Sequence, residues 1–466
     1  MKKISKHIAA IGLLCLLILL TACDTPPPVV ESVPEPTPAP TEALPASNVR
    51  YTPDGQRIIT IGTWFDRYYT SKHQTITDDP KLVDEDTAQL RLDNMRAIEA
   101  EQPIYLDSAN LTFEGLRESV NTSISGGSPD VDIYEVDLQF GIPAVMKGYA
   151  ISLEELGLVD TDVFGEQNVM TRLNLIGQES TYLFAPSQVD AFNVYALAFN
   201  MDMIRAAGLE NPQDLYDRGE WTWEVWRDYL IKLTKDTDGN GTKDIYGYSG
   251  YWTQLLRNLM FSNGTGIAMS QEQTLTTPET VEVIEFINTL YNKDKTARPW
   301  DESNWNINNE LYSEGKSAFW IGSDWIFSEQ GGAELPFEIG IVPWPCGPSG
   351  DPETNKHSQP QNNWFFIPKG TEDPQLIYNV IYDWTNWYRD DITLASDRKW
   401  AKAMYMTERN YQYAEMMGSK PGFDLWDSLG VNIDLLPMLK GEATAADMVE
   451  ANRGAYQDAL DEFFGK

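Results

Sequence analysis

The stretch Ile58-Ile59-Thr60-Ile61-Gly62 decides the fold class of this chain of 466 residues. A short run rich in β-branched residues is typical of a strand buried inside a sheet. Residues 86–99 follow it with apolar side chains at steps of four, three and three, which places them on one helix face. These side chains are Ala88, Leu92, Met95 and Ile98. A buried strand followed by an amphipathic helix predicts an α/β fold.

The same alternation continues through most of the chain. Further strands are predicted over 103–106, 131–136 and 195–199, and helices over 113–123, 139–148, 202–207, 222–234, 253–262 and 279–292. The tail from 374 to 466 has a mostly helical pattern, and Thr444 is a suitable N-cap for its last helix. Because a chain of this length rarely has a single core, we expect two or three core-sized units.

Composition and charge exclude several classes of function. The chain carries 35 basic and 70 acidic residues, a formal net charge of −35. This balance argues against nucleic-acid binding, which needs Lys and Arg to neutralise phosphates, and against docking on anionic lipid. Three cysteines and three histidines are too few for a disulfide framework or a histidine-rich metal site. The 15 Trp residues are many, and their flat faces suit a ligand with apolar faces of its own.

The first residues are typical of an export signal. Three lysines among the first six residues precede the apolar run 8–20, which is too short to span a bilayer comfortably. The run ends in Leu20-Thr21-Ala22-Cys23, which resembles a bacterial lipobox. The resemblance implies that residues 1–22 are a signal peptide and that Cys23 carries diacylglycerol. An ordinary secretory signal with a chance cysteine is the alternative.

Residues 23–49 are predicted to be the lipidated cysteine and a Pro-rich tether. Eight of the 26 residues from 24 to 49 are proline. Such a composition cannot bury a core and favours polyproline II, whose rise gives a reach of up to about 80 Å. No second apolar run is long enough to cross a bilayer. We therefore expect a protein that is anchored to the membrane, outside the cytoplasm, rather than one that spans it.

Five blocks of sequence follow one another in an order known from one protein family. They are 123–132, which is rich in Ser, Gly and Asp; 198–209, with Asn200-Met201-Asp202; 222–236; Tyr246-Gly247; and 314–325, with Gly322-Ser323-Asp324-Trp325. In this order the blocks resemble the extracellular solute-binding protein family 1 of ABC transporters, the sugar-binding group that includes maltose-binding protein. The resemblance covers nearly all of 57–466.

The resemblance implies a two-lobed, periplasmic-binding-protein-like fold of type II, with each lobe a mixed sheet flanked by helices. Residues 50–190 and 317–368 are expected to form the N-terminal lobe, and 191–316 and 369–466 the C-terminal lobe. The ligand would lie in the cleft between the lobes. Contacts that form only when both lobes touch the ligand would then favour hinge closure.

The segment after the first strand is a candidate for sugar recognition. Trp64, Asp66, Arg67 and Tyr68 offer ring faces, a carboxylate and a guanidinium. These groups read the C–H faces and hydroxyls of sugars. By resemblance, this turn faces the cleft, and Asp66 with Arg67 falls where an acidic and a basic residue grip hydroxyls. The alternative is a surface salt bridge beside core aromatics.

Other candidates come from strand ends and from tryptophans. Glu135 and Asp137, at the end of the third strand, occupy a position that lines the cleft in the family. The stacking candidates are Trp252, Trp325, Trp364 and Trp426, of which Trp325 resembles a ring that commonly contacts sugar. Six tryptophans in amphipathic patterns are expected to pack in the core instead. They are Trp221, Trp223, Trp226, Trp320, Trp384 and Trp387.

The segment 236–244 resembles the front of a calcium-binding loop. Oxygen donors stand at alternate positions and a glycine permits a sharp turn. The donors are Asp236, Asp238, Asn240, Thr242 and Asp244. Position 12 of the loop is Gly247 rather than a bidentate Glu, so this is not an EF-hand, and Asp244 would have to complete the shell. A structural Ca²⁺ site is expected, and a plain Asx/Gly turn is the alternative.

The leading hypothesis is a monomeric, membrane-tethered receptor that captures a neutral oligosaccharide and delivers it to the permease of an ABC importer, without catalysis and without a functional cofactor. A surface glycoside hydrolase is a second hypothesis, because the many acidic residues supply pairs of carboxylates by chance. A sensory or adhesion lipoprotein that binds sugar but serves no permease is the third.

Overall fold

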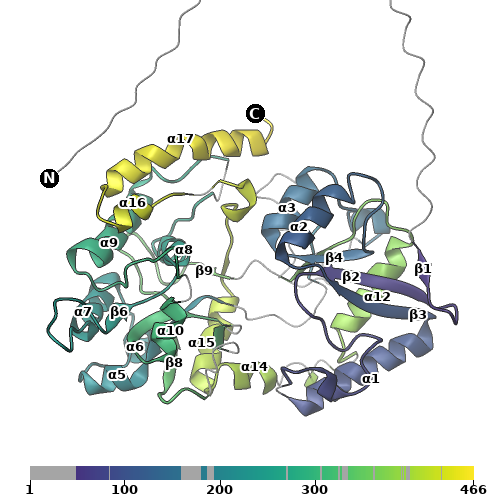
Figure 1. Cartoon of the computed structure of the whole chain (residues 1–466), viewed down its shortest axis with the longest axis horizontal. Helices are drawn as coiled ribbons and strands as arrows, with labels where there is room; N and C mark the ends of the chain where they lie inside the picture. Colours follow the sequence, from purple (N-terminus) through teal and green to yellow (C-terminus); the bar gives the residue numbers. More distant parts are fainter. Residues whose placement is uncertain are drawn as a thin grey trace, which may run out of the picture. The chain divides into compact units, whose positions relative to one another are not determined.

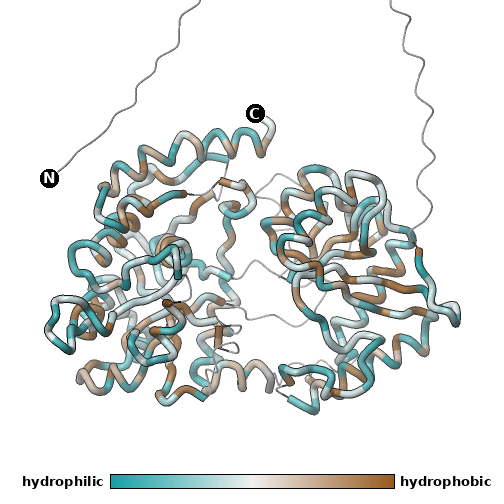
Figure 2. The backbone as a smooth tube through the Cα atoms, in the orientation of Figure 1, coloured by the Kyte–Doolittle hydropathy of each residue, from teal (hydrophilic) through white to brown (hydrophobic). Residues whose placement is uncertain are grey.

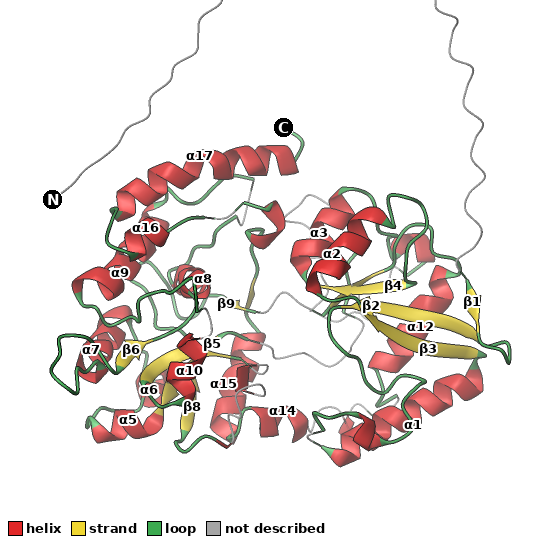
Figure 3. Ribbon diagram, viewed as in Figure 1, coloured by secondary structure: helices red, strands yellow, loops and turns green. Residues whose placement is uncertain are grey.

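The computed structural model describes residues 49–466 except 83, 159–179, 186–193, 269–270, 305–306, 324–325, 328–333, 360–362, 390, 392, 395–398 and 432. The expected signal peptide, Cys23 and nearly all of the tether lie outside the described residues, and so does Trp325. The described residues belong to one contact-defined unit, Pro45–Lys466, which contains two main sheets (Figures 1 and 3).

The first sheet is built around β2 (Arg57–Thr63), which contains the stretch of isoleucines quoted above. β3 (Ile104–Asn110) and β4 (Ile133–Val136) both pair with β2 in parallel. β10 (Trp364–Phe366) adds antiparallel to β4, and the short β1 (Arg50–Tyr51) adds antiparallel to the start of β2. The parallel strands therefore end at one edge of the sheet, which is where Asp137 follows β4.

Helices cover both faces of this sheet, because neighbouring residues of a strand point to opposite faces. In β10, Phe365 packs with α1 (Glu85–Glu101) and α12 (Pro374–Thr385). Trp364 and Phe366 pack instead with α2 (Phe113–Thr122) and α3 (Leu138–Met146). Figure 2 shows the resulting pattern as brown strands among helices of mixed colour. The helices predicted over 86–99, 113–123 and 139–148 are confirmed within a few residues.

The second sheet has the order β6-β7-β5-β8. β5 (Ala196–Asn200) pairs antiparallel with both β7 (Ser317–Gly322) and β8 (Ile339–Val342), and β6 (Tyr246–Tyr248) pairs in parallel with β7. Every residue of β5 is buried, and its large side chains alternate with alanines. Gly340 is required in β8, because a Cβ there would lie 2.2 Å from the ring of Phe199.

Two groups of helices surround the second sheet. Leu197 and Phe199 face the group of α7 (Trp223–Leu233), α8 (Trp252–Ser262) and α9 (Pro278–Asn288). Ala196 and Ala198 face the group of α10 (Ile307–Ser313), α14 (Lys399–Met404) and α15 (Glu408–Gly418). The remaining helices of this part are α5 (Met201–Ala206), α6 (Pro212–Asp217), α16 (Leu436–Leu439) and α17 (Ala445–Phe463).

The sheets correct the expected division of the chain into lobes. The segment 317–368 was assigned to the N-terminal lobe, but its first two strands, β7 and β8, pair with β5 of the second sheet. Only its last strand, β10, joins the first sheet. Conversely, α12 falls within 369–466 but packs on α1 and the first sheet. The reason is that a strand buried on both faces has the same apolar pattern in either sheet, so its sequence does not name its partner.

Among the described residues, no helix combines the length and the apolar character that a bilayer span needs.

Candidate ligand-binding site

Asp137 stands where the first sheet meets its helix α3. β4 ends at Val136, and Asp137 is the N-cap of α3, with its carboxylate accepting a hydrogen bond from the backbone N–H of Gln139 at 2.9 Å. A cap of this kind satisfies one of the donors that a helix start leaves free. The cap fixes the Asp137 carboxylate at the end of a parallel strand, the place where α/β proteins bind ligands.

Arg257 projects from α8 in the second half of the molecule. Its guanidinium donates to Asp424 at 3.0 Å and to Asp427 at 2.8 Å. It also lies 4.9 Å from the ring centre of Trp426. Arg257 and Asp424 are almost completely buried, whereas Asp427 is partly exposed. The arginine therefore neutralises a buried carboxylate and presents a second one toward solvent.

These two groups line one cavity of about 280 Å³. Its lining combines two carboxylates, a guanidinium, three amides and a phenol, the polar groups that recognise hydroxyls. They are Asp137, Gln139, Tyr195, Gln254, Arg257, Gln359 and Asp427. Asp137 and Gln139 come from the first sheet's α3, whereas Gln254 and Arg257 come from α8 beside the second. A hydrogen bond from Ser428 Oγ to the carbonyl of Leu138, at 3.4 Å, joins the same two parts.

Burial in the cavity raises the pKa values of its two carboxyl groups. Burial raises the pKa of Asp137 to about 7, and the nearby charge of Asp427 adds to this, against the hydrogen bond from Gln139. Burial also raises the pKa of Asp427, although Arg257 opposes the shift. Burial alone would lower the pKa of Arg257, but Asp424 and Asp427 outweigh it, so this pKa lies above its ordinary value. The site therefore holds a carboxyl group that gains its proton near neutral pH.

Asp66 and Arg67, which are expected to grip ligand hydroxyls, contact different residues of the protein. Arg67 Nε donates to Glu135 at 2.6 Å, and Glu135 has no exposed surface. Asp66 is exposed and accepts a hydrogen bond from Asn110 at 3.1 Å. A fully buried carboxylate needs a counter-charge more than an exposed one does, which explains why Arg67 turns toward Glu135. Glu135 therefore positions Arg67 and is shielded from the cleft.

The aromatic residues of the same segment pack against neighbouring rings. Trp64 is half-buried and meets Phe65 and Phe113 edge-on, with ring centres 5.0 and 6.2 Å away. Tyr68 is also half-buried and lies 5.5 Å from the ring of His73. Both rings keep exposed area, so their contact with a ligand stays a prediction.

The stacking candidates fall into two situations. Trp252 begins α8 and lies 6.5 Å from Trp426, next to the Arg257 cluster. Trp252 and Trp426 keep only 8% and 4% of their surface exposed, so they border the site mainly as packed walls. Trp364 is 6% exposed and belongs to the core under β10, which favours packing over sugar contact. Core packing is expected for Trp221, Trp223, Trp226 and Trp320, and their burial agrees with it.

Several lining residues were missed by sequence reasoning. Arg257 carried a signal, since it is the single charged residue of α8, a helix otherwise rich in Leu, Met and Phe. A charge among apolar neighbours requires a buried partner, here Asp424, 167 positions along the chain. Gln139, Gln254 and Gln359 carried no such signal, because glutamines at exposed helix and loop positions are common.

The loop predicted to bind calcium brings three carboxylates together. One oxygen from each of Asp236, Asp238 and Asp244 lies within 4.8 Å of the others. Asp236 accepts the backbone N–H groups of Gly239 and Gly241 at 2.7 and 2.8 Å. Hydrogen bonds from the hydroxyl and the backbone of Thr237 lower the pKa of Asp244. The donor set fits a hard cation, while Asn240 and Thr242 are engaged with each other through the Thr242 N–H at 2.7 Å.

Comparison with known families decides the membership of the chain. The family of bacterial extracellular solute-binding proteins matches residues 110–391, which is more than half of the sequence. The chain belongs to this family. Members of this family of solute-binding proteins work with ABC transporters. The match and the solved structures below confirm the expected family and the expected fold class.

Solved structures of similar fold are two-domain binding proteins. The cyclic α-maltosyl-1,6-maltose binding protein from Arthrobacter globiformis has a TM-score of 0.62 and 17% identity, with 88% of this chain and 100% of that chain covered. The substrate-binding protein Lmo0181 from Listeria monocytogenes, in complex with cycloalternan, has a TM-score of 0.59 and 15% identity over 88% and 99%. MalE from Bdellovibrio bacteriovorus, bound to maltotriose, has a TM-score of 0.57 and 16% identity over 88% and 100%. Among curated proteins, none matches this chain.

Proposed function

We propose that this solute-binding protein captures an oligosaccharide between its two halves and delivers it to the permease of an ABC importer. The single observation that carries the proposal is the cavity of about 280 Å³ whose polar lining comes from α3 on one side and from α8 and Asp427 on the other. A ligand bound there touches both halves at once. Binding energy from such a shared contact favours the closed arrangement over the open one.

The chemistry of the lining supports a hydroxyl-rich, neutral ligand. Carboxylates accept hydrogen bonds and amides both accept and donate them, as sugar hydroxyls require, and the ring of Trp426 lies 4.9 Å from the guanidinium of Arg257 in the same lining. The structural neighbours named above hold cycloalternan and maltotriose, which are oligosaccharides. The formal charge of −35 adds a long-range bias against acidic glycans, which salt screens in part.

A test of the proposal combines scattering with fluorescence. Small-angle scattering with and without maltotriose or a cyclic α-glucan should show a smaller radius of gyration when the ligand is bound, and Trp fluorescence should titrate with it. Gln139→Trp, which fills the cavity, should abolish both signals. Gln89→Trp, which places the same ring on the exposed face of α1, is the matched control and should keep them. Superimposable profiles with a broad panel of neutral glycans would overturn the proposal.

Hydrolysis is the second candidate function, and one observation favours it. Asp137, with a pKa raised to about 7, and the partly exposed Asp427 line the same cavity, and a glycosidase needs a protonated acid beside a carboxylate. Chromatography of the glycan after long incubation separates the two functions. Recovery of intact ligand supports the receptor, whereas new reducing ends that disappear in Asp137→Asn support the hydrolase.

We further propose that Cys23 anchors the protein outside the cytoplasm through a lipid. The lipobox-like Leu20-Thr21-Ala22-Cys23 and the Pro-rich tether support it. Mass spectrometry of the mature N-terminus should find Cys23 as the first residue with a diacylglycerol adduct. Cys23→Ser should release the protein from membranes, and an unmodified cysteine in the wild type would contradict the anchor.

Structural calcium in the loop 236–244 is proposed on the convergence of its three carboxylates. Calcium at millimolar concentration should raise the melting temperature, and a chelator should lower it again. Asp238→Asn should remove the response, while Asp228→Asn on neighbouring α7 serves as the control. Absence of both binding heat and a melting shift would refute calcium binding and leave an Asx/Gly turn.

A further inference from the structure

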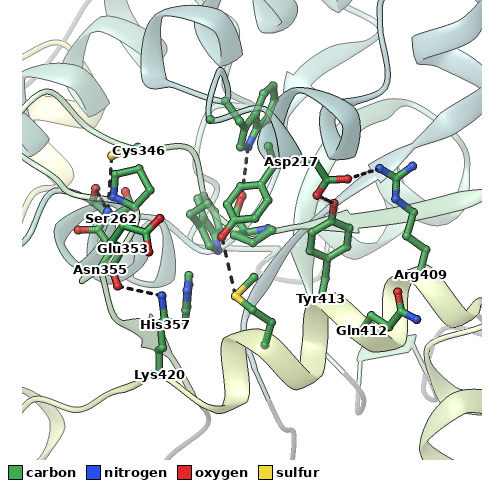
Figure 4. Close-up of a pocket in the computed structure, with 17 residues that line it drawn as sticks. Asp217, Ser262, Cys346, Glu353, Asn355, His357, Arg409, Gln412, Tyr413 and Lys420 are labelled. Carbon is green, nitrogen blue, oxygen red and sulfur yellow. Dashed lines mark hydrogen bonds and ion pairs between the residues drawn. The ribbon is translucent and has the colours of Figure 1, made fainter.

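A second cavity, of about 500 Å³, lies in the part of the molecule built around the second sheet (Figure 4). It is enclosed by α6, by α15 and by the segment 343–357 that follows β8. None of its lining residues belongs to the cleft cavity described above. Its volume falls in the range of pockets that hold small organic ligands.

Aromatic rings form much of its wall. They are Tyr216, Trp221, Trp344 and Tyr413. The polar atoms of the two indoles are used elsewhere, since Trp221 Nε1 donates to the carbonyl of Pro343 at 3.1 Å and Trp344 Nε1 to that of Tyr195 at 2.7 Å. What these rings offer to the cavity is therefore carbon surface, suited to stacking against apolar faces of a ligand.

His357 is a mostly buried polar side chain in the wall of the cavity. It is 8% exposed, it lines the cavity, and its backbone N–H donates to the carbonyl of Lys420 at 2.9 Å. No hydrogen bond reaches its ring from the described residues. Burial lowers the pKa of His357 to about 3, and Lys420 and Lys356 add to this, so the ring is neutral. A neutral imidazole has one donor and one acceptor, and at His357 both are available to a group that enters the cavity.

The charged residues around the cavity balance one another. Arg409 contacts Asp217 at 2.9 Å, and Tyr413 donates to the same carboxylate at 2.5 Å. Lys420 Nζ donates to the carbonyl of Glu353 at 2.9 Å. Figure 4 shows Asp217, Tyr413 and Arg409 on one side of the pocket and Glu353, His357 and Lys420 on the other. The lining carries two positive and two negative side chains, so it favours a ligand with no net charge.

We propose that this cavity is a second binding site, separate from the cleft, for a neutral mono- or disaccharide. Ring walls match the C–H face of a sugar, and the unpartnered His357 matches a hydroxyl, which donates and accepts as the imidazole does. The balanced charges disfavour an anion or a cation. Two links join this site to the cleft cavity. Trp344 donates a hydrogen bond to the carbonyl of Tyr195, which lines the cleft cavity, and His357 lies two residues before Gln359, which lines it as well.

Calorimetry and saturation-transfer NMR test the site with glucose, maltose and cellobiose as probes. At least one of them should bind wild-type protein, and its C–H protons should receive saturation. Gln412→Trp places a ring at the exposed rim of the cavity without touching the core and should reduce affinity at least tenfold. Gln89→Trp, which places the same ring on the exposed face of α1 and away from this cavity, is the matched control and should bind as the wild type does. His357→Phe should also lose binding, and Gln412→Trp keeps the test valid if that buried substitution prevents folding.

Cleft binding and second-site binding are told apart by the cleft variant. Gln139→Trp should lose the cleft ligand and keep the small-sugar signal, whereas Gln412→Trp should do the reverse. If Gln139→Trp removes both signals, the small sugars occupy the cleft and the second site is refuted. Binding of adenosine in place of the sugars, or no binding of any probe, likewise overturns the proposal, whatever the fate of the importer function.

Discussion

At the scale of the residue, Arg257 orders the wall of the cavity that comes from α8 and residues 424–427. It sits in an apolar helix face with two carboxylates, and one of them, Asp424, is 2% exposed. Removing one partner of a buried ion pair leaves the other charge without compensation, which costs more than the pair contributed. The neighbouring ring of Trp426 adds a cation–π contact.

Arg257→Met should therefore destabilise the protein by about 3–5 kcal/mol, the usual cost of an orphaned buried charge. Urea denaturation followed by fluorescence measures the loss. The double variant Arg257→Met/Asp424→Leu should recover most of it, because no charge then remains buried alone. A loss of under about 1 kcal/mol in the single variant would show that Asp424 finds water or protonates at little cost.

Asp137 makes stability depend on pH near neutrality. Its pKa is raised to about 7 in the folded protein from an ordinary value of 3.8, so the folded state keeps a proton that the unfolded chain has lost. Stability must therefore fall as pH rises between about 4 and 7. Asp137→Asn keeps an oxygen acceptor for the α3 cap and should flatten this decline. Urea midpoints at pH 4.5, 5.5, 6.5 and 7.5 measure it, and the exposed Asp458→Asn should leave the slope unchanged.

At the scale of the element, the last helix illustrates how much a short signal determines. Thr444 accepts the N–H of Asp447 at 3.2 Å, and the Asp447 carboxylate accepts the N–H of Thr444 at 2.8 Å, a reciprocal capping box. The chain leaves the preceding helix at Gly441, whose φ of +76° is the left-handed conformation that glycine adopts freely. The cap was predicted from the sequence and is confirmed.

Thr444→Ala should cost about 1 kcal/mol, the typical value for a lost N-cap. Thermal unfolding measures this loss, and Thr444→Ser, which restores the oxygen, should recover the wild-type value. Equal melting of all three proteins would mean that the start of α17 frays in solution. Far-ultraviolet circular dichroism would then show the same helix content in each.

At the scale of the whole molecule, binding in the cleft should appear as added stability. A ligand that binds only the folded state at 100 times its Kd adds about 2.7 kcal/mol to the free energy of unfolding. Maltotriose, or the glycan that titrates best, should give this increase with wild-type protein and with Gln89→Trp. Gln139→Trp should gain nothing at the same concentration. A full increase in that variant would place the oligosaccharide outside the cleft.

The local structure could be predicted from the sequence, because the β-branched run in β2 and the spacing of apolar residues in 86–99 act between neighbouring residues. The ordered blocks also predicted the family, which the match over residues 110–391 confirms. The sheet that β7 and β8 join and the partner of Arg67, Glu135, became known only from the tertiary structure. The tertiary structure also brought Asp137 to the cavity of Arg257 and Asp427. These outcomes depend on contacts between residues at least 68 positions apart. Over such separations burial and the need to neutralise charge select the partner, and the local sequence pattern carries no information about it.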